Sequence, residues 1–411
     1  MRRGALAGIL GLALLGGIAW GRPHVAAPSF HVAAHREPPQ VNRHGWVAKP
    51  LRIITFVQGG LGDREKLRQF PAAIAHSHWL KAFRTAYGIP GPTLVAGIDV
   101  IQLPTITPTT TKADFQSWID ARMRQINFVG RPGYQTIYIL YIPCSGGHGI
   151  DAFGRVSHHP GLDPLPNDSI FTHDDALAIS YFDPSQPFDF SGATKTATHE
   201  LAESATDEDS TGWYRQVSNL DKPYQDGSSP WVEDEGSGHI EVADLAQGSR
   251  WREKYGGNGV TYDYVRIISN AAVTHGGDPA VPASPHPYYN TTAPKTWYDL
   301  PIAGSTSVKV TGWSTKKIPA WPVAAGIPSW SGSKDGSGQD PCKLGSSSFT
   351  VANGGTFTLK VTATAPAALD DWCVVRLKSS RFADAALGDV FHAWYIGFRI
   401  TRHPASVHKA G

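Results

Sequence analysis

A proline-rich segment divides this chain into two parts whose hydrophobic patterns differ. Residues 276–294 contain five prolines, at positions 279, 282, 285, 287 and 294, and such a segment is typical of a stiff linker. Before it, β-branched runs alternate with apolar residues at helical spacing, whereas beyond it only short strand patterns occur. We therefore expect an α+β domain at residues 51–275 and an all-β module at residues 295–403.

The first part carries strand and helix patterns in alternation. Four β-branched or aromatic runs are expected as strands: residues 51–57, 94–103, 136–142 and 176–182. Residues 70–87 have apolar side chains at helical spacing, and Gly88 and Pro90 end that pattern.

The second part is predicted to be a β-sandwich. Residues 349–361 alternate polar and apolar side chains on both sides of Asn353-Gly354, which predicts a hairpin. Cys342 and Cys373 both lie in this module and are expected to form a disulfide if the chain is exported. The third cysteine, Cys144, is then left as a free thiol.

The N-terminus predicts export. Met1-Arg2-Arg3 is basic, and the uncharged apolar run 5–20 would span only about 24 Å as a helix, short of a bilayer core. Small residues follow, so we expect a signal peptide at residues 1–27; an uncleaved N-terminal anchor is the alternative. A proline- and histidine-containing linker at residues 28–50 comes next. The mature protein is expected to be extracellular or periplasmic, without stable membrane insertion.

The charge is almost balanced overall but uneven along the chain. Lys and Arg number 37 and Asp and Glu 35, for a net charge of +2, so we expect no nucleic-acid partner. Six of the nine glutamates, however, lie between Glu200 and Glu241. This window holds the residues whose chemistry is most specific.

The sequence His199-Glu200-Leu-Ala-Glu203 predicts a metal-binding helix. His199 and Glu203 are separated by four residues and share a helix face, which suits two ligands of one ion. Glu200 is rotated by about 100° and can reach water beside the ion. Zinc accepts imidazole nitrogen and carboxylate oxygen. The pattern follows the logic of the His-Glu-x-x-His zinc helix. It predicts that the domain at residues 51–275 has a zincin-like mixed sheet and an active-site helix.

A third metal ligand must come from another segment. Glu241 and Asp244 follow about 40 residues later, and His239 would share a strand face with Glu241. His239, Glu241 and Asp244 are therefore competing candidates. The alternative for the whole cluster is a solvated acidic surface.

These motifs resemble the secreted Exordium, or phosphate-induced protein, family. The similar segments are the 199–203 helix, Thr206-Asp207, Trp213-Tyr214 and 241–244, preceded by 77–88, so that the resemblance covers roughly residues 53–269. This chain has Glu208 and Leu245 where members usually have proline and often cysteine, respectively. The resemblance implies an exported, cell-wall-associated protein, and it does not define a substrate.

The sequence leaves two candidate functions. The first is a secreted zinc-dependent hydrolase, a metallopeptidase acting on peptides or proteins, in which Glu200 accepts a proton from water. Two carboxylate ligands beside a single histidine would weaken zinc as a Lewis acid, which favours the second function. This is a non-catalytic exported protein with a structural metal that binds cell-wall polysaccharide through its β-module.

Overall fold

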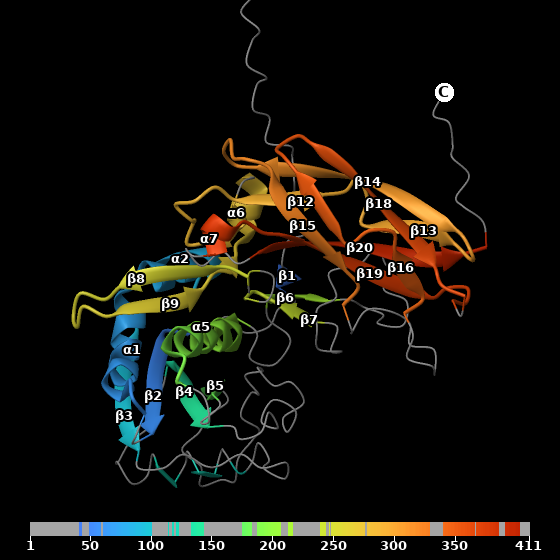
Figure 1. Cartoon of the computed structure of the whole chain (residues 1–411). Helices are drawn as coiled ribbons and strands as arrows, with labels where there is room; N and C mark the ends of the chain where they lie inside the picture. Colours follow the sequence, from blue (N-terminus) through green and yellow to red (C-terminus); the bar gives the residue numbers. More distant parts are fainter. Residues whose placement is uncertain are drawn as a thin grey trace, which may run out of the picture. The chain divides into compact units, whose positions relative to one another are not determined.

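The structure is a computed structural model (Figure 1). It describes residues 41–42, 49–58, 61–100, 114, 117–118, 121–122, 133–143, 175–182, 187–206, 213–216, 239–243, 246, 248–275, 278–328, 340–365, 367–385 and 391–402. The expected signal peptide, most of the 28–50 linker, Cys144 and Asp244 lie outside this set. Within it, no helix is both long enough and apolar enough to cross a membrane.

A parallel sheet forms the centre of the first part. Its strands are β2 (Leu51–Gln58), β3 (Leu94–Val100), β4 (Gln135–Pro143) and β5 (Asp175–Phe182), in the order β3-β2-β4-β5. Every pairing among them is parallel. The chain is thus of mixed α and β type as expected, but the described strands of this sheet do not show the mixed pairing that we expected.

Both faces of this sheet are buried, which explains why its strands are continuous apolar runs. Ile53 and Ile139 belong to the core shared with the helices, while Phe56 and Tyr138 stack on the opposite face. Trp118 packs edge-on against Phe56 from that opposite side.

Two helices replace the single helix expected at residues 70–87. They are α1 (Arg64–His76) and α2 (His78–Tyr87). Ser77 separates them because its backbone is extended, with φ −79° and ψ 151°, and its side chain accepts a hydrogen bond from Leu80 N. Gly88 ends α2 with φ 72°, a conformation that glycine adopts without strain.

Short antiparallel pairs complete the first part. Strands β8 (Arg250–Lys254) and β9 (Thr261–Val265) form a hairpin. Strands β1 (Val41–Asn42), β6 (Trp213–Gln216) and β7 (His239–Glu241) form a small sheet. Strands β10 (Ile267–Ile268) and β11 (Ala280–Val281) pair on either side of α6 (Asn270–His275).

Two sheets make up the second part. One has the order β12 (Tyr289–Thr292), β14 (Ser305–Ser314), β18 (Thr356–Ala363) and β16 (Cys342–Leu344). The other has the order β13 (Trp297–Pro301), β20 (His392–Thr401), β19 (Trp372–Ser379), β15 (Trp321–Gly326) and β17 (Ser348–Val351). A short helix, α7 (Phe382–Ala385), precedes β20. Strands of both sheets contribute to one buried cluster. Strand β12 lies within the proline-rich segment.

The predicted disulfide is confirmed. Cys342 of β16 and Cys373 of β19 are bonded, with their Cα atoms 6.2 Å apart, so the bond joins the two sheets.

The Asn353-Gly354 turn differs from the expected hairpin. It connects β17 of one sheet to β18 of the other, and these strands pair with different neighbours. Asn353 Oδ1 accepts a hydrogen bond from Ser314 N at 2.9 Å, and Gly354 N donates to Gly312 O at 2.8 Å. The turn is therefore tied to β14, which directs the chain from one sheet to the other.

Candidate metal centre

The helix that carries the motif is α5 (Phe190–Thr206). Asp189 begins it, because its Oδ1 accepts a hydrogen bond from Gly192 N at 2.9 Å and its carbonyl accepts one from Ala193 N. In Figure 1 this helix lies between the β8–β9 hairpin and strands β4 and β5, which it contacts. All residues from Ala197 to Thr206 are buried, so the motif lies on the enclosed half of the helix.

Three hydrogen bonds hold α5 against its neighbours. Ser180 Oγ of β5 donates to Ala193 O at 3.2 Å, and Gln135 Nε2 of β4 donates to Ser204 O at 2.8 Å. Val265 N of β9 donates to Thr198 Oγ1 at 2.9 Å. These bonds, two from the sheet and one from the hairpin, fix the position and rotation of the helix.

His199, Glu200 and Glu203 converge within the core. His199 Nε2 lies 2.9 Å from Glu203 Oε1, and each of the three residues offers a ligand atom within 4.8 Å of the others. The exposed fraction of the side chain is 11% for His199 and 1% for Glu203, and Glu200 is 1% exposed. The structure thus brings His199 and Glu203 together as expected, and it places Glu200 close to both.

The donor atoms suit a zinc ion. Ligand atoms about 2.1 Å from a tetrahedral zinc lie about 3.4 Å from one another, so His199 Nε2 and Glu203 Oε1, 2.9 Å apart here, would move apart by about 0.5 Å to hold one. Burying two carboxylates beside one imidazole is costly unless a cation or protons balance their charge. One nitrogen and two oxygens form a donor set that zinc accepts.

A lysine lies one helical turn before His199. Burial lowers the pKa of Lys195 below its usual value, and the nearby Arg250 lowers it further, while Asp263 acts in the opposite direction. Arg250 itself donates to Asp263 at 3.2 Å. Lys195 therefore holds its proton less tightly than an exposed lysine does.

The third-ligand candidates lie on or just after β7. His239 pairs with Gln216 and Glu241 with Tyr214, so the two candidates occupy the same side of the strand. The side chains of both, and all of Asp244, are outside the described part of the chain. Val242 and Ala243, which follow β7, belong to the same buried cluster as the Leu201 face of α5.

Two supporting residues were not identified from the sequence. Gln135 lies 69 residues before its partner Ser204, and no local pattern links them. Thr198 adjoins His199 and is buried. The sequence signal for it was a threonine inside the helix, directly before the motif.

Comparison with known proteins adds little to this geometry. No protein-family model and no curated protein matches the sequence. Among solved structures, the ASH/PapD-like domain 7 of human CEP192 is 8% identical over 28% of this chain and 86% of that chain, with a TM-score of 0.22. The C. elegans MSP family member WR4 is 10% identical over 28% of this chain and 100% of that chain, with a TM-score of 0.20. The Pseudomonas aeruginosa CupB2 chaperone is 16% identical over 29% of this chain and 57% of that chain, with a TM-score of 0.19. These scores are too low to carry an argument about function, and the Exordium resemblance stays a prediction.

Proposed function

We propose that the chain is an exported, zinc-dependent hydrolase that acts on peptides or proteins, with a zincin-like first domain followed by a β-sandwich module. One observation carries this proposal: a histidine and two glutamates converge, buried, on a single helix. Active sites are places where burial and neighbouring charges are arranged around ionisable groups, so this cluster is a candidate functional site.

Each residue of the cluster has a role in this proposal. His199 and Glu203 hold the metal together with one of His239, Glu241 and Asp244. A bound zinc ion would lower the pKa of a coordinated water and polarise a substrate carbonyl. Glu200 accepts the proton from water and passes it to the leaving amine.

Metal analysis tests the site directly. The purified mature protein is expected to contain one zinc per chain, and His199→Ala is expected to lose it, because an imidazole ligand is removed. The exposed His76 provides a control, since His76→Ala should keep the metal. Full retention of zinc by His199→Ala would reject the site.

A second function is favoured by one specific observation. Glu200 is only 1% exposed, whereas a general base must reach substrate and water. This burial supports a non-catalytic exported protein in which the metal braces α5 and the β-module binds polysaccharide.

Glu200→Gln separates the two functions. In the hydrolase, this variant keeps zinc and loses about a hundredfold or more of its turnover on a peptide library, the usual effect of removing a general base. Equal turnover by wild type and variant contradicts the catalytic role of Glu200. Absence of turnover in both, with zinc retained, supports the bracing role.

A further inference from the structure

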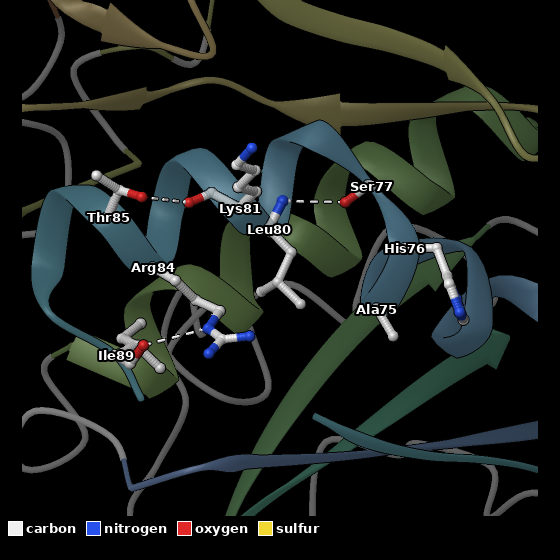
Figure 2. A pocket seen from close by; sticks show the side chains of 8 residues that line it. All are labelled: Ala75, His76, Ser77, Leu80, Lys81, Arg84, Thr85 and Ile89. Atoms are coloured by element: carbon white, nitrogen blue, oxygen red, sulfur yellow. Dashed lines mark hydrogen bonds between the residues drawn. The ribbon is translucent and has the colours of Figure 1, made fainter. Parts of the chain in front are cut away.

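A hollow of about 500 Å³ lies over α2 and the end of α1 (Figure 2). Its lining residues come from one continuous segment: Ala75, His76, Ser77, Leu80, Lys81, Arg84, Thr85 and Ile89. The buried Leu80 and Ile89 supply an apolar floor, and the rim is polar. The volume lies within the range of small-molecule sites.

The rim of this hollow carries positive charge. Among the described residues, no carboxylate lies within ion-pair distance of Lys81 or Arg84. Arg84 Nε donates to Ile89 O at 3.2 Å, which orients the guanidinium (Figure 2). The Arg84 guanidinium also packs against Gly91, so closely that a Cβ at that position would collide with it. The two Nη groups of Arg84 form a fork suited to a carboxylate or phosphate.

A second hollow, of about 320 Å³, adjoins the first at His76, which lines both. It is lined on its other sides by Ala73, Glu253, Lys254, Tyr255, Gly256, Gly257 and Tyr264. Glu253 is held in place by His78, whose backbone N lies 2.9 Å and whose Nδ1 lies 2.8 Å from its carboxylate oxygens, and by Trp251 Nε1 at 2.8 Å. The Tyr255 ring lies 5.9 Å from the His76 ring. This second hollow therefore combines an oriented hydrogen-bond acceptor with aromatic surface.

We propose that the two hollows form one binding site for an acidic saccharide. Figure 2 shows Lys81 and Arg84 on opposite sides of α2, so Arg84 binds the carboxylate of one sugar and Lys81 binds the carboxylate of a neighbouring sugar. Glu253 accepts hydrogen bonds from the hydroxyls of the next sugar, whose C–H face packs on the Tyr255 ring. Five of the eight lining residues of the first hollow are polar or charged, which disfavours a lipid. This site shares no residue with the α5 cluster, so it does not depend on the proposed hydrolase.

Calorimetric titration with trigalacturonic acid tests the site in the full mature chain. Lys81 is exposed, so Lys81→Glu should fold normally while weakening binding about tenfold or more, because a charge-assisted hydrogen bond is replaced by repulsion. Lys309→Glu is the matched control, since Lys309 is an exposed lysine on β14. That variant should bind as the wild type does.

Four further comparisons decide the outcome. Neutral maltotriose should not bind, and Tyr255→Ala should weaken binding of trigalacturonic acid. His199→Ala should leave binding unchanged, so that failure of the metal site and failure of this site are distinguishable. Unchanged affinity in Lys81→Glu overturns the proposal. Equal binding of triglutamate also overturns it, because the site would then recognise acidic peptides.

Discussion

At the scale of single residues, the described part of the chain buries ionisable groups in several places. One is the motif cluster on α5. Another is His392 in the second part, whose ring packs 4.3 Å from the Tyr288 ring and 5.0 Å from the Tyr289 ring. Burial, together with the positive charge of Arg266, lowers the pKa of His392 to about 3. The folded protein therefore holds this imidazole neutral.

This burial predicts that His392 destabilises the protein in acid. The unfolded chain binds a proton at His392 below about pH 6.5, whereas the folded chain binds it only near pH 3. As the pH falls from about 6.5 to about 3, His392 alone should therefore lower the free energy of unfolding by about 1.4 kcal/mol per pH unit. Denaturant titrations of wild type and His392→Phe between pH 7.5 and 4 measure it. The variant should lose stability less steeply, and equal slopes would contradict the assignment.

At the scale of elements, α5 is positioned by contacts from distant parts of the chain. Thr198 illustrates this, because its hydroxyl donates within the helix and accepts from Val265 N of β9. Thr85 of α2 makes the same bond within its helix, to Lys81 O at 2.9 Å, but is exposed. Replacing each threonine in turn therefore distinguishes the hydrogen bond within a helix, which both residues make, from the bond to β9, which only Thr198 makes of the two.

We expect Thr198→Val to lower the free energy of unfolding by about 1–3 kcal/mol, because a buried backbone N–H loses its acceptor while the side-chain volume is kept. Thr85→Val should change it by less than about 0.5 kcal/mol. Chemical denaturation gives both values. Similar losses in the two variants would show that the bond to β9 does not contribute.

Elements were predictable where the pattern was local. The strands around Ile53, Ile139 and Ala178 are continuous apolar runs because both faces of their sheet are buried, and the α5 motif is readable from its own spacing. The break at Ser77 was not predicted, because apolar spacing continues across it. The Asn353-Gly354 turn does not form the predicted hairpin, because hydrogen bonds to β14 set the direction of the chain after it. The role of Gln135 was not predicted, because its partner Ser204 lies 69 residues further along the chain.

At the scale of the whole molecule, the Cys342–Cys373 bond links the two sheets of the second part. The closed loop spans a sequence separation of 31 residues, for which the loss of chain entropy in the unfolded state predicts about 3.7 kcal/mol of stabilisation. The double variant Cys342→Ser, Cys373→Ser should lose about that much in denaturant titrations. A loss close to zero would mean that the sheets are held together without the bond.

Thiol counting on the same protein checks the pairing. Wild type denatured without reductant should show one free thiol, from Cys144, and three after reduction. Three thiols before reduction would contradict the pairing.

The position of β20 has a consequence for the order in which the chain is made and folded. This strand is the last one that the structure describes, yet it lies inside its sheet, parallel to β13 on one side and antiparallel to β19 on the other. The ribosome makes β20 after the other strands of this sheet, so the five-stranded sheet cannot close before residues 392–401 have been synthesised. A nascent chain stopped before His392 would leave β13 without its partner strand. The second part can therefore complete this sheet only once residues 392–401 have been synthesised.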